Sequence, residues 1–259
     1  MKKQFEKVFP KKHLGQHFLI DEDVAINIVN ALMHEPGIVH VLEIGPGMGV
    51  LTKYLLQHPI QLELIEIDVE SVNYLNNNFP TLQANIIRED FLKLDFSRLN
   101  NPIAVIGNFP YQISTQILFK ILAHKDQVNV VVGMFQKEVA SRIAAPPGNK
   151  EYGIPSVLLQ AWFDIEYLFS VEHTKFHPPP KVQSGVIRLI RNSRTDLGCD
   201  EKTFTLVVKQ AFNYRRKTLR NSLRGLIQPE KLDALPYASL RPEQLSWQQF
   251  AELANFVNS

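Results

Sequence analysis

The feature that most constrains this sequence is the alternation of short apolar runs of strand length with helical stretches over its first two-thirds. Such alternation is typical of a mainly parallel sheet with helices on both faces. After Gly153 two strand-like runs follow each other without a clear helix between them, which predicts an antiparallel pair that includes the last strand. The expected strands are His40–Ile44, Gln61–Ile67, Ile103–Gly107, Val128–Phe135, Trp162–Phe169 and Gln183–Ile190, and the expected helices are Leu51–Gln57, Val69–Asn76 and Ser114–Ala123.

The character of the chain changes after Arg191, where a polar, linker-like segment leads into a region without strand candidates. Apolar residues from Phe204 to Phe212 recur there at helical spacing. We also expect helices at Leu232–Leu235 and Trp247–Phe256, and a long basic helix over Asn213–Arg224. The prediction is therefore an α/β domain over residues 1–191 and a small all-α domain over residues 192–259.

Composition limits the cellular setting. The 259 residues are 45% hydrophobic, which is enough for a substantial core. The single Cys199 cannot form an internal disulfide, and no apolar run approaches the length of a membrane span. The N-terminal residues lack the apolar segment of a signal peptide. We expect a cytoplasmic monomer without a membrane partner.

Positive charge is concentrated in two blocks although the net charge is only +2. Such blocks indicate an anionic partner such as nucleic acid. The alternative, a solvated helix surface, stays open for the second block. The first block holds Lys2, Lys3, Lys7, Lys11 and Lys12, and the second holds Lys209, Arg215, Arg216, Lys217, Arg220 and Arg224.

A glycine-rich turn follows the first long strand candidate. Gly45, Gly47 and Gly49 stand at alternate positions before a helical stretch, so the backbone can approach a ligand closely. A dinucleotide fingerprint would require glycine where Val50 stands. The pattern, which begins at Glu43, instead resembles the first motif of class I methyltransferases, with Gly45 and Gly47 at the cofactor. A purely structural turn is the alternative.

Acidic residues follow at the ends of the next strands. Glu66 lies 21 residues beyond Gly45, where the carboxylate of a nucleotide-binding sheet accepts hydrogen bonds from ribose hydroxyls. Asp68 is the second choice for this role. Asp90 is placed to accept a hydrogen bond from the adenine amine of a cofactor. Each acid alone could be a solvated loop carboxylate, but their recurrence at strand ends favours a ligand site.

The most specific motif is Asn108-Phe109-Pro110-Tyr111 at the end of a buried-type strand. It resembles the (Asn/Asp)-Pro-Pro-(Tyr/Phe) signature of amino-group methyltransferases. The Asn108 amide oxygen and the Phe109 carbonyl can each accept one hydrogen of an adenine amine, and Pro110 orients that carbonyl. Tyr111 offers a stacking face for a flipped-out base. The alternative is a turn that ends a core strand.

Two further segments fit the same pocket. His17 and Leu19 precede a helix that Asp21 can cap, and this segment could fold over a cofactor. Phe176 could form the other wall of an adenine sandwich, or could simply fill the core. We expect no metal site, because no second histidine or cysteine stands at ligand spacing from His17.

Together these segments resemble the KsgA family, the small-subunit rRNA adenine N6,N6-dimethyltransferases. The resemblance implies a class I, Rossmann-like methyltransferase domain, a helical RNA-binding domain and S-adenosylmethionine as methyl donor. It implies a substrate of two adjacent adenosines near the 3′ end of 16S rRNA in the immature small ribosomal subunit. The matching segments are Gly15–Leu19, Glu43–Thr52, Glu66–Asp68, Asn108–Thr115, Lys175–Gly185 and Ala211–Leu219.

The resemblance also assigns roles to single residues. The second residue of the catalytic motif, commonly Leu in the family, is Phe109 here, a change we expect to be tolerated because the backbone carbonyl acts. Some relatives carry Asn where His17 stands. The second basic block gains a role as a footprint on rRNA phosphates. Cofactor contacts fall on His17, Leu19, Gly45, Glu66, Asp90 and Asn108.

Three alternative functions remain. A 23S rRNA adenine methyltransferase that confers macrolide resistance shares the chemistry, but the Gly15–Leu19 segment and the basic Asn213–Arg224 region favour the small-subunit enzyme. An assembly checkpoint factor would depend on binding more than on catalysis. A DNA adenine methyltransferase is less favoured, because no segment resembles a base-reading domain.

Overall fold

The computed structural model describes residues 8–259, so Lys2, Lys3 and Lys7 of the first basic block lie outside the described residues. The chain divides into two compact units: Met1–Ala140 with Glu166–Arg191, and Ser141–Ile165 with Asn192–Ser259. One boundary between the two units lies after Arg191. The segment 141–165, which the sequence alone places in the first domain, groups with the C-terminal residues instead. Among the described residues no helix is long and apolar enough to cross a membrane.

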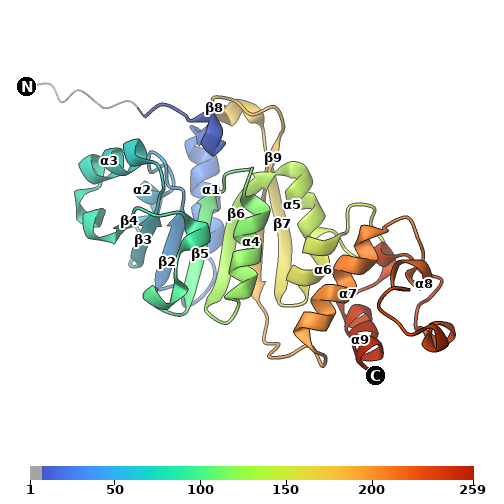
Figure 1. The fold of residues 1–259 in the computed structure, drawn as a ribbon. Coiled ribbons are helices and arrows are strands. Elements are labelled where there is room, and N and C mark those ends of the chain that lie inside the picture. Colours follow the sequence, from blue (N-terminus) through green and yellow to red (C-terminus); the bar gives the residue numbers. More distant parts are fainter. Residues whose placement is uncertain (1–7) are drawn as a thin grey trace, which may run out of the picture. The chain divides into compact units, whose positions relative to one another are not determined.

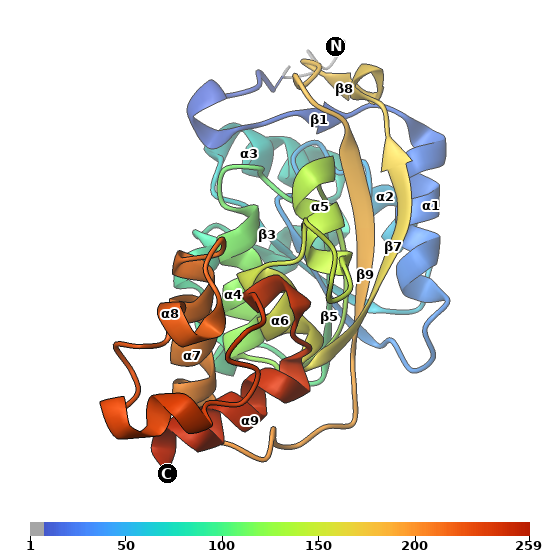
Figure 2. The same cartoon turned by 90° about the vertical axis from the view of Figure 1, so that its right-hand side faces the viewer.

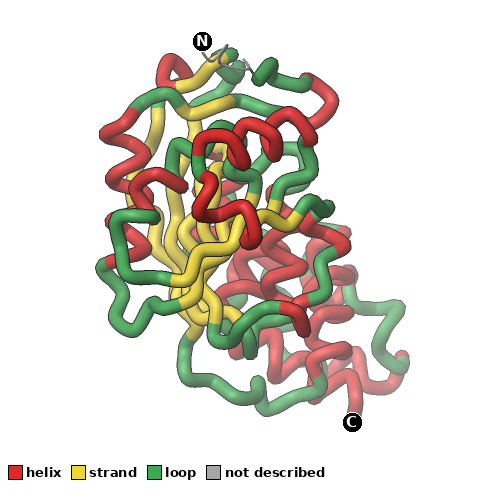
Figure 3. Tube along the Cα trace, turned by 90° about the vertical axis from the view of Figure 1, so that its left-hand side faces the viewer, coloured by secondary structure: helices red, strands yellow, loops and turns green. Residues whose placement is uncertain are grey.

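A seven-stranded sheet, yellow in Figure 3, forms the centre of the first unit. Its strands follow the order β4–β3–β2–β5–β6–β9–β7 (Figure 1). Neighbouring strands from β4 to β6 are parallel, whereas β9 pairs antiparallel with β6. The predicted mainly parallel sheet with an antiparallel last strand is confirmed. The strands are β2 His40–Ile44, β3 Gln61–Ile65, β4 Ile86–Ile87, β5 Ile103–Asn108, β6 Val128–Gln136, β7 Phe163–Val171 and β9 Ser184–Arg191.

Helices cover both faces of this sheet, and α1 and α4 lie on opposite sides of it (Figures 1 and 2). The helix α1 (Glu22–Met33) begins after Asp21, whose carboxylate accepts a hydrogen bond from the Val24 amide at 3.0 Å. The helices α2 (Thr52–Leu55), α3 (Val69–Asn78) and α4 (Ser114–Ala123) each follow a parallel strand. These connections are the helical stretches that the sequence predicts.

A second, two-stranded sheet lies beyond one end of the large one (Figure 2). It pairs β1 (Phe18–Leu19) antiparallel with β8 (Phe176–His177), so that Phe18 faces His177 and Leu19 faces Phe176. Strands of two residues are too short to show an alternating pattern, and the sequence therefore gives no sign of them. The pairing holds the N-terminal segment across the end of the large sheet.

Helices dominate the rest of the chain. After β6 come α5 (Lys137–Ala144) and α6 (Ile154–Gln160), and after β9 come α7 (Glu201–Asn213), α8 (Leu219–Ser222) and α9 (Trp247–Asn258). The expected helices at residues 204–212 and 247–256 are confirmed. The segment expected as a helix at residues 232–235 belongs to a 3-10 helix, Pro229–Ala234, instead.

The predicted long basic helix over residues 213–224 is wrong. The helix α7 ends at Asn213, residues 214–217 form a turn, and α8 begins only at Leu219 after Thr218 in an extended conformation. Arg215, Arg216 and Lys217 are adjacent like charges without an acid among them, which gives a helix no stabilising side-chain pairs. The block is therefore spread over the end of α7 (Lys209), the turn at residues 214–217, α8 (Arg220) and the turn that follows α8 (Arg224).

The ring of Phe109 fills a slot between β5 and β6 just beyond the end of β5. The ring is 1% exposed and packs edge-on against Phe135, with centroids 5.1 Å apart. A Cβ atom added to Gly133 would lie 2.4 Å from the ring, and one added to Gly107 would lie 2.7 Å from it. Two glycines in neighbouring strands thus make room for this side chain, which anchors the segment that follows β5.

Replacing Gly133 by Ala should therefore destabilise the protein. The added methyl group meets buried rings on two sides, and overpacking of this kind costs about 1–3 kcal/mol. Urea unfolding measures the loss. The matched control is Gly225→Ala, whose Cβ would meet no atom within 4 Å, and its unfolding curve should coincide with that of the parent protein. Equal stability of the two variants would contradict the slot.

Candidate active site

A cavity of about 240 Å³ lies where the parallel strands end. The ends of β2, β3 and β5, the loop after β4 and the N-terminal segment all contribute to its lining. Parallel strands bring their carboxyl ends to one edge, so segments distant in sequence meet there. The lining residues are Leu14, Gly15, Gln16, His17, Phe18, Ile44, Gly45, Gly47, Ile65, Glu66, Ile67, Glu89, Asp90, Phe91, Leu92, Asn108, Phe109, Pro110, Tyr111, Gln112 and Ile113.

Most of the residues selected from the sequence meet in this cavity, and Leu19 and Phe176 do not line it. Leu19 lines a smaller hollow of about 30 Å³, which shares Phe18, Gly45, Gly47 and Asn108 with the main cavity. The selected residues in the main lining are His17, Gly45, Gly47, Glu66, Asp90, Asn108, Phe109, Pro110 and Tyr111.

The glycine-rich turn brings backbone to the cavity wall. Gly47 has a φ of +56°, and a Cβ atom there would lie 2.9 Å from the ring of Phe18. A larger residue would be strained by its conformation and would displace the segment that covers the turn. Glycine is therefore required here by the N-terminal segment as well as by any ligand.

The Glu66 carboxylate connects this turn to the end of β3. One oxygen accepts a hydrogen bond from the Gly47 amide at 3.1 Å, and the other accepts one from the Asp68 amide at 2.9 Å. Burial raises the pKa of Glu66. These two bonds hold the carboxylate at the cavity wall, where its remaining lone pairs can accept hydrogen bonds from a ligand.

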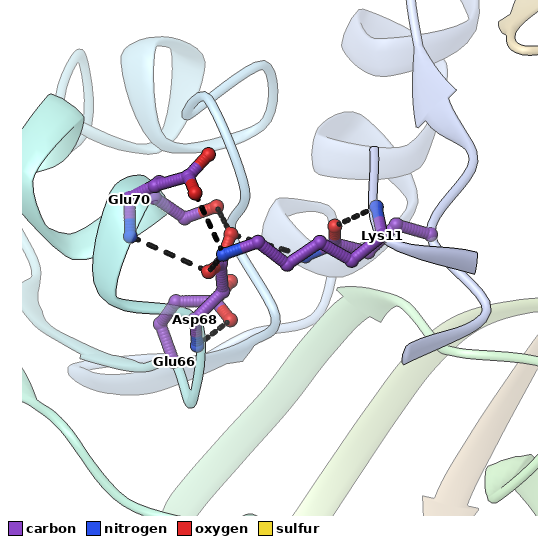
Figure 4. A network of polar contacts seen from close by, with 6 residues as sticks. Lys11, Glu66, Asp68 and Glu70 are labelled. Carbon is purple, nitrogen blue, oxygen red and sulfur yellow. Dashed lines mark hydrogen bonds and ion pairs between the residues drawn. The ribbon is translucent and has the colours of Figure 1, made fainter. Parts of the chain in front are cut away.

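Asp68, the second choice from the sequence, has a structural role and does not line the cavity. Its carboxylate accepts from the Ser71 hydroxyl at 3.0 Å and caps α3. It also forms an ion pair with Lys11, whose ammonium lies 3.1 Å from Glu70 as well (Figure 4). Asp68 therefore fastens the N-terminal segment.

The N-terminal segment carries His17 over the cavity. The Lys11 amide donates a hydrogen bond to the Gln16 side chain at 2.8 Å, which tightens the turn between them. The Nδ1 atom of His17 donates to the Pro178 carbonyl at 2.8 Å. The ion pair at Lys11 and this bond fix the segment at both ends. No sequence pattern reveals these contacts.

The motif after β5 lies beside this segment. The Asn108 side-chain nitrogen donates a hydrogen bond to the His17 carbonyl at 2.8 Å, which turns the donor side of the amide toward the segment. The Phe109 amide donates to the Met134 carbonyl at 3.2 Å, and the Phe109 ring lies in the core. Within residues 8–259, no donor makes a hydrogen bond to the acceptor atoms of the motif, the Asn108 amide oxygen and the Phe109 carbonyl.

Tyr111 is held firmly at the cavity. Its hydroxyl lies 2.6 Å from the hydroxyl oxygen of Ser184, a fully buried residue at the start of β9. Burial raises the pKa of Tyr111. One face of its ring stacks with His17 at a centroid distance of 5.6 Å and an interplanar angle of 27°. The aromatic surface expected for a base is thus present, with His17 on one side of it.

Phe176 takes the position that the sequence analysis gave as its alternative. It is 2% exposed and belongs to the hydrophobic core, while the next residue, His177, is exposed. The alternation of a strand explains this arrangement, because β8 turns one side chain inward and the next outward. The structure therefore does not bring Phe176 to the cavity.

The second basic block is presented at the surface of the second unit. Lys209, Arg216, Lys217 and Arg224 are exposed. The Lys217 ammonium lies 5.1 Å from the ring centroid of Tyr214, which is itself 48% exposed. Two members of the block have protein partners: Arg220 pairs with Asp233 at 2.6 Å, and Arg215 donates to the Lys150 carbonyl.

Glu43, the first residue of the glycine motif, belongs to the site although the sequence predicts no role for it. It is 1% exposed and lines the smaller hollow, and its carboxyl group accepts a hydrogen bond from the Thr52 hydroxyl at 2.6 Å. Burial, with the charge of Glu66 nearby, raises the pKa of Glu43 to about 8. A glutamate in the middle of an apolar strand was the available signal.

Comparisons with known proteins agree with this geometry. A family profile described as ribosomal RNA adenine dimethylase matches residues 9–258. The ribosomal RNA small subunit methyltransferase A of Parabacteroides distasonis is 58% identical over 248 residues, which cover 95% of this chain and 93% of that protein. The protein of the same name from Cytophaga hutchinsonii is 56% identical over 256 residues, 98% of this chain and 99% of that protein.

Solved structures share the fold. A dimethyladenosine transferase from Plasmodium falciparum superimposes with a TM-score of 0.77 at 24% identity, over 92% of this chain and 96% of that one. The 23S rRNA methyltransferase ErmE gives a TM-score of 0.70 at 24% identity, over 92% of this chain and 99% of that one. The predicted class I methyltransferase fold is confirmed.

The buried Glu43 should make stability depend on pH. Its folded-state pKa of about 8 lies above the ordinary value of 4.5, so between these values the folded protein holds a proton that the unfolded chain releases. Stability therefore decreases as pH rises through this window. The free energy of unfolding is measured with denaturant at pH 5.5 and at pH 8. Between these pH values it should decrease in the parent protein by at least about 1 kcal/mol more than in Glu43→Gln. An identical decrease in both proteins would contradict the protonated state.

Proposed function

This chain belongs to the ribosomal RNA adenine dimethylase family, and from that membership we propose that it methylates N6 of adenosines in 16S rRNA. The family predicted from the motifs is confirmed, and the chain is an rRNA methyltransferase. The finer proposal is a substrate of two adjacent adenosines in the 3′-terminal stem-loop, dimethylated while the small ribosomal subunit is immature. The observation that carries the chemistry is the pair of free acceptors after β5, beside an acid-lined cavity.

We propose S-adenosylmethionine as the methyl donor, because the donor and acceptor groups of the cavity fit it. Glu66 presents a carboxylate, held by two backbone amides, to ribose hydroxyls. Asp90 lies in the lining on the loop after β4, where an adenine amine can be recognised. The glycine turn lines both the cavity and the smaller hollow, so its backbone lies where the amino-acid part can approach it. When bound, this cofactor supplies an electrophilic methyl group on a positively charged sulfur.

The residues of the chain then need only to position and polarise the target amine. The lone pair of an adenine amine is delocalised into the ring, so the amine is a weak nucleophile. The Asn108 oxygen and the Phe109 carbonyl each accept one of its hydrogens, which favours a pyramidal nitrogen with an available lone pair. The His17 carbonyl fixes the Asn108 amide so that its oxygen is the acceptor. Because these acceptor groups are already in place, the protein does not have to reorganise them when the reaction starts.

Tyr111 is proposed to stack on the target base. Its hydroxyl is tied to Ser184, so the ring keeps its orientation when a base arrives. Base–aromatic stacking contributes roughly 1–3 kcal/mol, which helps to offset the unstacking of the base from its RNA. Because His17 covers one face of the ring, the base either uses the other face or replaces the imidazole.

Among the alternatives, small-subunit rRNA is favoured over 23S rRNA. The relatives named as small-subunit methyltransferases are 56–58% identical to this chain, whereas the 23S enzyme ErmE is 24% identical. The basic block on α7, the following turn and α8 supports a role in RNA binding, and such binding is also compatible with an assembly checkpoint. We propose that the protein is a monomer in the cytoplasm, where ribosomal subunits are assembled.

Asn108→Ala should reduce turnover by about two to three orders of magnitude, as the loss of one preorganised hydrogen-bonding group does. The test is mass spectrometry of 16S rRNA from a strain that lacks this gene. Parent protein should restore dimethyladenosine near the 3′ end, and Asn108→Ala should not, although it still binds immature subunits. Asn30→Ala, an exposed position on α1, is the control. Methylation of 23S rRNA, or full activity of Asn108→Ala, would refute the proposal.

Replacing Arg215, Arg216 and Lys217 by glutamine should weaken binding to small-subunit rRNA and flatten its dependence on salt. Each lost phosphate contact reduces the slope of log K against log salt by about 0.7–0.9. Binding measured across a salt series gives the slope. Lys202→Gln, an exposed lysine on α7 outside the block, should leave it unchanged. A parental slope in the triple variant would remove the block from the RNA footprint.

A further inference from the structure

One wall of the cavity is a loop that needs support from elsewhere. Glu89, Asp90, Phe91 and Leu92 line the cavity, and the 3-10 helix Phe91–Lys93 follows Asp90 directly. One Asp90 oxygen accepts a hydrogen bond from the Leu92 amide at 2.9 Å, which caps this short helix. A single 3-10 turn is weakly stable by itself. Contacts from outside the loop must therefore hold Asp90 in place.

Lys120 on α4 provides such contacts. Its ammonium group donates hydrogen bonds to the Leu92 carbonyl at 2.8 Å and to the Leu94 carbonyl at 2.6 Å. The same group lies 5.8 Å from the ring centroids of both Phe91 and Phe96. Two charge-assisted hydrogen bonds and two cation–π contacts thus converge on one side chain.

The surroundings of Lys120 keep it in this position. His124, the residue directly after α4, stacks on Phe96 with centroids 4.1 Å apart and donates from Nδ1 to the Lys120 carbonyl at 2.9 Å. Burial lowers the pKa of Lys120, and the charges of Asp90, Glu89 and Asp95 act in the opposite direction. The ammonium is partly removed from water and directed to the loop backbone.

The choice of partners matters for the site. The charge of Asp90 partly offsets the lowering of the pKa of Lys120 by burial, yet the two side chains form no ion pair in the part of the chain that the structure describes. An ion pair would occupy the carboxylate that a nucleotide base must reach. Bonding to carbonyl groups fixes the loop and leaves the Asp90 oxygen that does not bond to the Leu92 amide available. The helix that carries Lys120 begins at Ser114, just after the Asn108–Tyr111 motif.

We propose that Lys120 is a positioning residue that holds the Asp90 loop in register for recognition of the cofactor's adenine ring. Through α4 it connects this loop to the segment that carries the acceptor groups for the target amine. The adenine part of the inference rests on the proposed function, whereas the support of the loop does not. The two parts can therefore be tested separately.

The first experiment follows amide hydrogen exchange in the cofactor-free protein. In Lys120→Met, which keeps a long apolar side chain but no donor, exchange should accelerate at residues 92–94 and stay unchanged in β2 and β5. Lys93→Met is the matched control, because Lys93 is an exposed lysine on the same 3-10 helix and does not line the cavity. Parental exchange at residues 92–94 in Lys120→Met would overturn the inference whatever cofactor the protein uses.

The second experiment titrates S-adenosylhomocysteine and S-inosylhomocysteine, which has an oxygen in place of the adenine amine. Parent protein and Lys93→Met should prefer the adenosyl compound. Lys120→Met should bind it about ten-fold more weakly, the loss expected for hydrogen bonds to a charged group, and the preference should shrink. Lys120→Arg, which retains donors, should recover part of the preference.

The outcomes separate the two proposals. Parent protein that binds neither compound would contradict the proposed function, while faster exchange at residues 92–94 in Lys120→Met would still support the loop. If Lys120→Met weakens binding of both compounds by the same factor, Lys120 contributes only general stability and the positioning role is refuted. Unchanged binding of both compounds would refute it as well.

Discussion

The burial of one aromatic ring orients the chemical end of the site. Phe109 follows directly after β5, and glycines in β5 and β6 leave the space that its side chain fills. Once the ring is in the core, the backbone around it has little freedom, so the Phe109 carbonyl and the neighbouring Asn108 amide keep a fixed direction. A leucine would need less room, which explains why a phenylalanine here requires glycine on both strands.

The polar groups of the cavity divide into those that build it and those that remain available. Backbone amides hold the Glu66 carboxylate at the cavity wall, whereas the Asp68 carboxylate, two residues later, caps α3 and pairs with Lys11. The Asn108 amide donates to the His17 carbonyl, and its oxygen remains available as an acceptor. This division follows from where each side chain lies, because the carboxylates of Glu66 and Asp68 have the same hydrogen-bonding capacity but different neighbours.

Much of this arrangement could be predicted from the sequence, because strand-end motifs of a parallel sheet converge on one edge. This rule predicts the strands β2, β3, β5 and β6, and it predicts that Gly47, Glu66 and Asn108 lie at the cavity. What could not be predicted depends on contacts between distant residues. Lys11 meets Asp68 across 57 positions, the pairing of β1 with β8 leaves no periodic signal, and Phe176 is buried by that pairing. The end of α7 at Asn213 could not be predicted either, because the basic segment that follows contains no glycine or proline to mark the end of a helix.

The small β1–β8 sheet has a consequence for the order in which the site matures. Phe18 and Leu19 leave the ribosome early, but their partners His177 and Phe176 emerge only after most of the large sheet has been synthesised. Closing so long a loop carries an entropic cost that local contacts do not repay, so such pairings form late in folding. In a nascent chain the carboxylates and the glycine turn therefore form before the N-terminal segment is fixed above them. The cavity closes only once the residues around position 177 are free to fold.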